Sequence, residues 1–238
     1  STRIVNSILP SRTDDIFLIA GDQIEVQAGR DDELCCDLNL QIRLFALSAC
    51  HSVPPAPQLL REIAESTATD SGELSESGAE DFLEIMNSIG AIGATLRLMY
   101  KAGVLEKIIP EMTRARGLLE FNEYHQFTVD EHSFRAVEAA ENFHEEASLL
   151  GQAYGEVRRK HLLHLALLLH DMGKGYEEDH SVVGGRIAGD VADRLGLKPS
   201  HRERLIFLVE NHLIMSHLAF RRNLSDLDVI LPFTRDVG

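Results

Sequence analysis

Apolar and polar residues recur at helical spacing along most of the chain, but one short segment near its start alternates instead. In residues 16–27, IFLIAGDQIEVQ, apolar residues alternate on both sides of Gly21 and Asp22, which predicts a short β-hairpin. From Glu33 onward the period is helical, and we expect helices over 33–51 and 55–66. The pattern therefore predicts an all-α protein with a small hairpin at its front.

A small, polar and acidic stretch, STATDSGELSESGAE, interrupts the helical pattern over residues 66–80. Its composition is typical of a mobile loop rather than a domain boundary. After it we expect helices near 80–89 and over 91–102, the second ended by Gly103, since glycine commonly follows a helix C-terminus.

Two capping-box patterns mark helix starts in the second half of the chain. TVDE at 128–131 predicts a helix from about Val129, and SHRE at 200–203 predicts another over 201–215. Between them we expect one helix that runs to Asp171 and a further one over about 181–195. These elements complete a helical bundle.

Composition and charge limit the class of protein and its partners. With 44% hydrophobic and 26% charged residues, the chain can bury a sizeable core in one or two domains. Its net charge of -15 argues against nucleic-acid binding, because affinity for a polyanion comes largely from clustered Lys and Arg. No apolar run approaches the length of a membrane span, and the first residues lack a signal-peptide pattern, so we expect a cytoplasmic location and no membrane partner. Cys35, Cys36 and Cys50 lack metal-site spacing and are expected to be reduced thiols.

The stretch LLHLALLLHDMGKGYEEDH, residues 162–180, carries unusual chemistry. A helix that is apolar on almost every side expects burial, yet this one ends in His170 and Asp171. Burying the pair costs on the order of several kcal/mol unless a charged partner is present. Because an anion is also disfavoured at a helix C-terminus, capping alone does not explain Asp171. We therefore expect a bound cation there.

Three further histidines are predicted to reach the same place. His180 begins the next helix, and His212 follows an inward stripe of Leu205, Leu208 and Val209. Steps of three and four from His132 likewise give an apolar stripe, formed by Ala136, Ala139, Ala140 and Phe143. Imidazole with carboxylate suits Zn, Fe, Mn, Co or Ni. A single inward histidine is more often a hydrogen-bonded core residue, and we leave the remaining histidines to surface or packing roles.

Taken in order, these residues resemble the HD-domain metal-dependent phosphohydrolases, whose pattern is a histidine, an adjacent His-Asp pair and a distant aspartate. His132 in DEHS and the pair in HDMGKG match this order, and DHSVVG supplies the additional histidine of two-metal members. The resemblance implies an HD-type helical bundle that binds one or two divalent ions, Mn, Mg, Fe or Zn. The ligands it implies are His132, His170, Asp171, His180 and His212.

Residues 121–135, 167–184 and 208–226 are similar to the HD domain of the bifunctional uridylyltransferase/uridylyl-removing enzymes, which modify the bacterial nitrogen-regulatory PII protein. We accordingly assign 1–90 to an N-terminal hairpin with linker helices and 91–238 to an HD phosphohydrolase domain. The family's terminal aspartate lies beyond the matched region. This departure implies a fragment whose HD domain is truncated at its C-terminus.

The reaction that the resemblance implies is hydrolysis of the phosphodiester joining UMP to a tyrosine of uridylylated PII. Asp171 and Lys174 would be catalytic, and Lys174 would neutralise charge on the transition state. Arg221 and Arg222 would bind the phosphate or an acidic partner surface, although solvated surface roles are equally open for both. A general HD-type nucleotide phosphohydrolase and a non-catalytic regulatory HD module remain alternatives, and the oligomeric state is left open.

Overall fold

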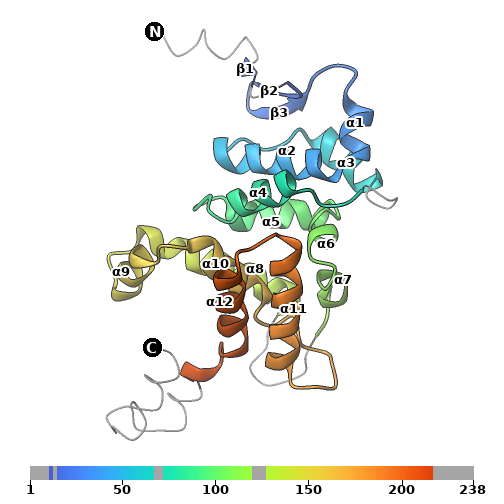
Figure 1. Ribbon diagram of the computed structural model, residues 1–238. Helices are drawn as coiled ribbons and strands as arrows, with labels where there is room; N and C mark the ends of the chain where they lie inside the picture. Colours follow the sequence, from blue (N-terminus) through green and yellow to red (C-terminus); the bar gives the residue numbers. More distant parts are fainter. Residues whose placement is uncertain (1–10, 13–14, 67–71, 120–126, 217–238) are drawn as a thin grey trace, which may run out of the picture.

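The structure is a computed structural model that describes residues 11–12, 15–66, 72–119 and 127–216. Helices make up most of it, and a small sheet lies at one end, as the alternating and helical patterns predicted. Figure 1 shows the N-terminal helices between this sheet and the helices of the second half. None of the described helices is long and apolar enough to cross a membrane, and the expected cytoplasmic location stays a prediction.

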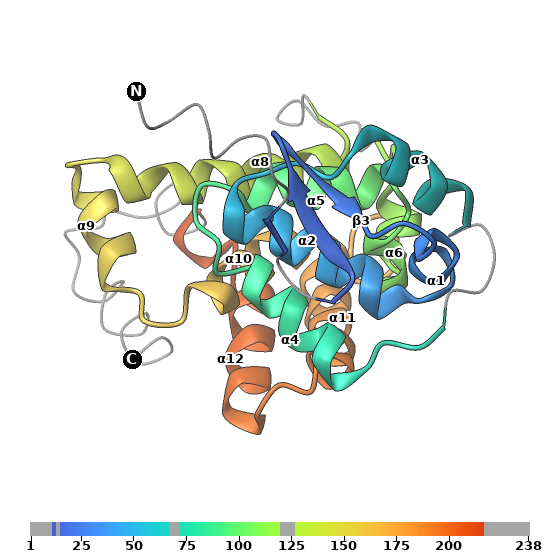
Figure 2. The same cartoon turned by 90° about the horizontal axis from the view of Figure 1, so that it is seen from above.

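The sheet contains three antiparallel strands in the order β1 (Ser11–Arg12), β2 (Phe17–Ala20) and β3 (Gln23–Val26). β2 and β3 form the predicted hairpin, in which Ile19 lies opposite Ile24; β1 was not expected. Phe17 and Ile24 are fully buried, and the Ile24 N–H donates to the carbonyl of Pro54 at 2.8 Å. These contacts attach the sheet to the helices beneath it, and Figures 1 and 2 both show it lying over α2 (Leu38–His51).

The single helix predicted over 33–51 is wrong, because the chain breaks at Asp37 into α1 (Asp31–Cys36) and α2. Asp37 has an extended backbone, and its carboxylate accepts hydrogen bonds from the N–H groups of Asn39 and Leu40. An N-cap needs this non-helical conformation, so the capping bond ends one helix and begins the next. The following helix, α3 (Pro57–Ser66), lies within the range predicted for it.

The polar stretch over 66–80 becomes helical earlier than predicted. α4 (Glu76–Ile85) begins after Ser75, whose hydroxyl accepts from the Gly78 N–H at 3.1 Å, so the loop assignment is wrong from residue 76 onward. Residues 67–71 of this stretch lie outside the described residues. α5 (Ile92–Lys101) and the positive φ of Gly103 (76°) confirm the helix predicted over 91–102 and its end.

Two short helices, α6 (Leu105–Ile108) and α7 (Met112–Ala115), lead to α8 (Val129–Asn142), which begins where predicted. The capping box is wrong, since the Thr128 side chain makes no cap bond to the helix and Glu131 instead pairs with Arg97 at 2.7 Å. The predicted apolar stripe on this helix is partly wrong, since Ala140 is buried but Ala139 is exposed. Because α8 packs against both α5 and α10 (Lys160–Leu169), its buried residues are Val129, Asp130, Ser133, Phe134, Val137, Ala140 and Glu141.

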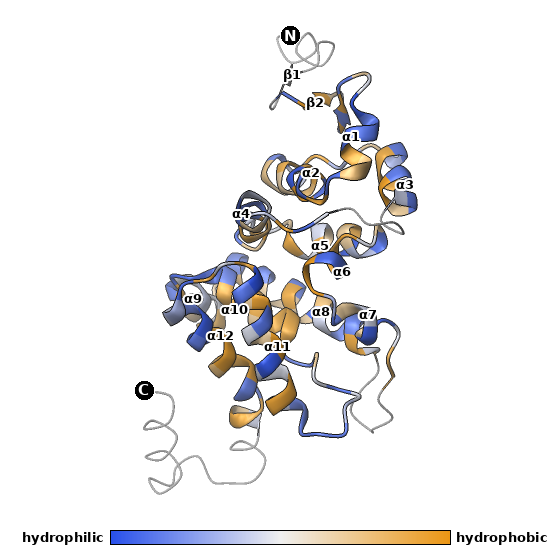
Figure 3. Ribbon diagram, turned by 45° about the vertical axis from the view of Figure 1, so that its right-hand side comes forward, coloured by the Kyte–Doolittle hydropathy of each residue, from blue (hydrophilic) through white to orange (hydrophobic). Residues whose placement is uncertain are grey.

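After α8 come the 3-10 helix η1 (Phe143–Glu145), α9 (Leu149–Glu156), α10, α11 (His180–Arg194) and α12 (Pro199–Glu210). α12 begins with Pro199 at its first turn and Lys198 as N-cap, so the box predicted at 200–203 is wrong; proline, with its preset φ, favours that first position. α11 and α12 pack closely at Gly184, which has no side chain: a Cβ there would lie only 3.0 Å from the Val209 side chain. Figure 3 shows hydrophobic residues gathered where α8, α10 and α11 meet.

Candidate metal centre

α10 delivers the His-Asp pair to the centre of the second half. The helix ends at Leu169, His170 is its C-cap residue, and Asp171 follows directly. The Nδ1 of His170 lies 2.7 Å from the carbonyl oxygen of Leu167, so Nδ1–H donates to it and Nε2 keeps a lone pair. This is the tautomer that binds a metal through Nε2.

Gly173 brings the turn after Asp171 directly against the start of α11. A Cβ at this position would lie 2.0 Å from the carbonyl oxygen of His180 and 2.7 Å from the amide nitrogen of Gly184, so no other residue fits here without a shift of the backbone. Asp179 caps α11 by accepting from the N–H of Ser181 at 2.9 Å. The close approach and the cap together place His180 beside the His-Asp pair.

His132, in the first turn of α8, and His212, shortly after α12, complete the cluster. The Nδ1 of His212 lies 2.7 Å from the carbonyl oxygen of Val209, which leaves its Nε2 facing the cluster. Ring centroids are 5.1 Å apart for His132 and His170, 5.2 Å for His170 and His212, and 5.4 Å for His180 and His212. Four separate elements thus bring four imidazoles together.

Asp171 lies between these rings. Its Oδ2 is 3.3 Å from the Nε2 of His170 and 3.6 Å from that of His132, while its Oδ1 is 3.7 Å from the Nε2 of His212. Nitrogen and oxygen ligands about 2 Å from one ion lie roughly 3 to 4 Å from each other. In two groups, His132 with His170 and Asp171, and Asp171 with His180 and His212, the ligand atoms lie within 4.8 Å of one another. The geometry offers two adjacent cation positions that share one carboxylate.

Two ring nitrogens of the cluster are buried without a hydrogen-bond partner. They are the Nε2 atoms of His180 and His212. A buried polar atom that stays unpaired costs about 1–3 kcal/mol, so most such atoms are paired in folded proteins. The donor set of imidazole nitrogens and a carboxylate is also the set that divalent transition metals prefer. The residues present therefore fit a divalent cation.

Lys174 is the charged partner of Asp171 within the protein. Its Nζ lies 2.9 Å from Oδ2, and the two side chains are only 7% and 5% exposed. Burial alone would raise the pKa of Asp171, but His170 and Lys174 together hold that pKa well below its usual range. Burial also lowers the pKa of His212, which favours the neutral imidazole that can bind a metal.

The structure brings together all five residues predicted as ligands, together with Lys174. Arg221 and Arg222, predicted to bind substrate, lie outside the described residues. His164 lies away from the cluster: it is fully buried and its ring contacts the hydroxyl of Tyr154 at 2.9 Å and the carbonyl of Met86 at 2.6 Å. The close approach at Gly173 could not be read from the sequence, where only the glycine after the HDM triplet marks it.

Comparisons with known proteins match the part of the chain that carries the cluster. The HD domain family matches residues 129–232. The chain is 32% identical over 232 residues to a "Bifunctional uridylyltransferase/uridylyl-removing enzyme" of Novosphingobium aromaticivorans, an alignment that covers 93% of the chain and 25% of the relative. The chain thus spans about a quarter of the length of that curated relative. The four histidines and Asp171 of the cluster all lie within residues 129–232, so the part of the chain that carries the cluster is similar to HD domains.

Proposed function

We propose that this chain hydrolyses a phosphodiester at the metal centre, and that its substrate is the uridylylated tyrosine of the PII protein. The cluster of four imidazoles around Asp171, with two buried ring nitrogens left unpaired, is the observation that carries the proposal. The uridylyl-removing activity in the name of the relative, which is 32% identical over 93% of this chain, supports the choice of substrate.

In the proposed reaction the bond between phosphorus and the tyrosine oxygen breaks, and a bond from a water oxygen to phosphorus forms. The tyrosine oxygen regains a proton, so the products are UMP and unmodified PII. One or two divalent ions, Mn, Mg, Fe or Zn, would be held by His132, His170, Asp171, His180 and His212. When bound, such an ion lowers the pKa of a water molecule and neutralises charge on the phosphoryl oxygens.

The residues of the chain supply orientation and charge. The carbonyl oxygens of Leu167 and Val209 accept from the Nδ1–H groups of His170 and His212, and this fixes both rings with Nε2 toward Asp171. His170 and Lys174 together keep Asp171 ionised, and Lys174 would add a positive charge to neutralise the charge that develops on the phosphoryl group. Arg221 and Arg222 are retained as proposed contacts for the phosphate or an acidic surface of PII, on the sequence alone.

The proposal is tested by release of UMP from uridylylated PII, measured chromatographically with the Mn-loaded chain. His170→Gln removes one proposed ligand and is expected to lower the rate at least about a hundredfold, because loss of a ligand should cost at least as much as loss of a residue that supports one. The matched control is His144→Gln, since His144 is exposed on η1, outside the cluster. This control is expected to retain the rate of the unmodified chain.

A panel of other phosphate esters separates the proposal from its alternatives. Hydrolysis of nucleoside monophosphates or cyclic nucleotides, with uridylylated PII left intact, would replace it with a general HD-type nucleotide phosphohydrolase. The chain would instead be a non-catalytic HD module if it binds no divalent metal and hydrolyses none of the esters. In that case His170→Gln would change neither the metal content nor the hydrolysis rate. Elemental analysis of the purified chain provides the metal content for this comparison.

A further inference from the structure

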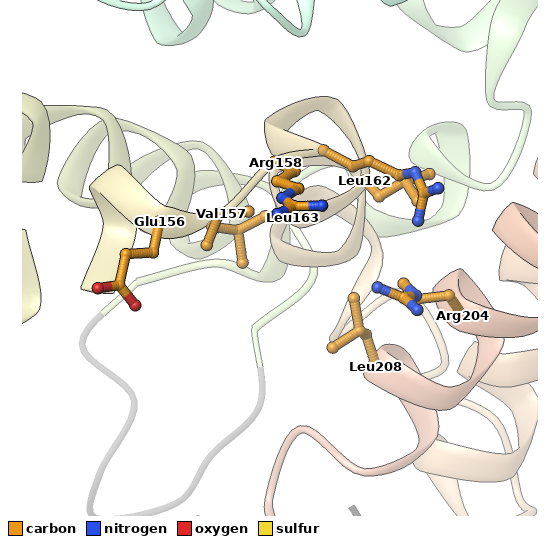
Figure 4. A pocket seen from close by; sticks show the side chains of 8 residues that line it. Glu156, Val157, Arg158, Leu162, Leu163, Arg204 and Leu208 are labelled. Atoms are coloured by element: carbon orange, nitrogen blue, oxygen red, sulfur yellow. The ribbon is translucent and has the colours of Figure 1, made fainter. Parts of the chain in front are cut away.

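A hollow lies between the start of α10 and α12, and none of the cluster residues lines it. It has a volume of about 700 Å³. Its walls combine an apolar part with a basic part, and Figure 4 shows the lining side chains. The apolar part comes from Val157, Leu162, Leu163 and Leu208, the basic part from Arg158, Arg159 and Arg204, and Glu156 is the remaining lining residue.

This pocket shares two helices with the metal centre but none of its proposed ligands. Along α10, Leu163 precedes His170 by seven residues, which corresponds to roughly 10 Å of helix axis. Leu208 precedes His212 by four residues, a rise of roughly 6 Å if the helical rise continues past the end of α12. The pocket therefore lies toward the start of α10, whereas His170 lies at the end of α10 and His212 lies beyond the end of α12.

The three arginines of the pocket differ in their ion pairing from many other arginines in the described part of the chain. Arg158 and Arg159 come from the connection before α10, and Arg204 comes from α12; all three are exposed. None of them takes part in the ion pairs that form among the described residues. Such pairs do engage other arginines: Arg30, Arg43, Arg97, Arg116, Arg135, Arg186 and Arg202.

Figure 4 shows the guanidinium groups of Arg158 and Arg204 reaching into the pocket from different elements, while the Glu156 carboxylate lies at its far end. In a chain with a net charge of -15, positive groups gathered at one opening raise the local potential and attract an anion. The N-terminus of α10, which no side chain caps, lies at the same opening and adds to that potential.

We infer that this pocket binds a small organic anion through its phosphate or carboxylate groups. Guanidinium groups present paired N–H donors that match both kinds of anion. The three leucines and Val157 offer an apolar surface for a ring or hydrocarbon body, and the volume is within the usual range of small-molecule sites.

The test is calorimetric titration of the metal-free chain in EDTA, so that anions do not collect at the metal centre. The probes are ADP, isophthalate and inorganic phosphate; the first two distinguish a phosphate from a carboxylate ligand. We expect one of these two to bind at a single site more tightly than inorganic phosphate, with an affinity that falls as salt is added.

Arg204→Gln and Arg158→Gln are each expected to weaken that binding about tenfold or more, because each removes a charge-assisted hydrogen bond. Leu208→Ala should weaken binding of the organic anion but leave binding of inorganic phosphate unchanged, since it removes only apolar contact. The matched control is Arg61→Gln, on α3, which should bind as the unmodified chain does.

His170→Gln separates this inference from the proposed function, because it should abolish hydrolysis while leaving anion binding intact. Equal binding by the unmodified chain and Arg204→Gln would overturn the inference, and so would failure of all three probes to bind. If the probes fail and Arg204→Gln instead raises the KM for a protein substrate, the pocket is a docking surface for an acidic protein segment and the small-anion assignment is wrong.

Discussion

The Nζ of Lys174 lies 2.9 Å from the Oδ2 of Asp171, with both side chains almost fully buried, so the carboxylate at the middle of the cluster already has a cationic partner. Lys174→Met removes that partner. Removing one member of a buried ion pair leaves the other charge buried and unpaired, which lowers the free energy of unfolding by roughly 3–5 kcal/mol. We therefore expect the metal-free variant to have a clearly lower Tm than the unmodified chain.

A divalent ion at the same carboxylate would compensate for the lost lysine charge. Mn is therefore expected to raise the Tm of Lys174→Met by more than it raises the Tm of the unmodified chain, because binding to the folded state stabilises it. Calorimetry with and without Mn gives both differences, and Lys101→Met, at an exposed position on α5, is the control. Identical Mn-induced shifts in the variant and the unmodified chain would contradict a metal at Asp171.

Gly173→Ala tests whether the close approach of the turn to α11 is needed to assemble the cluster. The added Cβ would lie 2.0 Å from the carbonyl oxygen of His180, so the turn and the helix must separate. We expect Mn affinity to fall at least about tenfold, which is the usual loss when a contact that orients a metal ligand is removed. Gly155→Ala is the matched control because nothing lies within 4 Å of its added Cβ. Unchanged Mn affinity in Gly173→Ala would show that His180 is not positioned through this contact.

The side chain of Glu141, on α8, accepts hydrogen bonds from backbone N–H groups at the start of α5, and its removal should lower stability. Its buried carboxylate accepts from the N–H groups of Gly90, Ile92 and Gly93 at 2.9, 3.1 and 3.0 Å, and so caps α5 from α8. Glu141→Ala leaves these donors unpaired, and we expect the free energy of unfolding in urea to fall by about 2–4 kcal/mol. The exposed Glu145, on η1, provides the control variant Glu145→Ala, which should change stability little.

Stability should also depend on pH through His164. Burial lowers the pKa of this ring below its ordinary value of 6.5, although the hydrogen bond to the Met86 carbonyl acts in the opposite direction. Because the unfolded chain then binds the proton more readily, the contribution of His164 is fully present above pH 6.5 and is lost as the pH falls below it.

The measurement is the free energy of unfolding in urea at pH 7.5 and pH 5.5, with EDTA present to keep metal binding out of the comparison. His164→Gln should lose less stability between these two pH values than the unmodified chain does. His51→Gln, at an exposed position on α2, should retain the full loss. An equal loss in His164→Gln would mean that other groups account for the pH dependence.

Local patterns predicted most of the helices, because periodic apolar residues and glycine stops act within one or two turns of the chain. α3, α5 and α11 lie close to their predicted ranges, and the hairpin of β2 and β3 forms where residues alternate. Three of the failures, at helix starts, have a shared cause. Thr128 and Ser200 were predicted to cap helices and do not, whereas Asp37 caps a helix whose start was not predicted. Which side chain caps a helix depends on competing partners that the pattern does not contain.

The sequence by itself determined which residue types carry the chemistry: an apolar helix that ends in His170 and Asp171 indicates a cationic partner. The resemblance to HD domains then named His132, His180 and His212 as the further candidates. Only the tertiary structure decided that four elements meet at Asp171, that Lys174 pairs with it, and that His180 and His212 each keep an unpaired buried nitrogen. It also decided the buried face of α8, which follows from packing against α5 and α10. Such contacts join residues far apart in the chain, and no local periodicity records them.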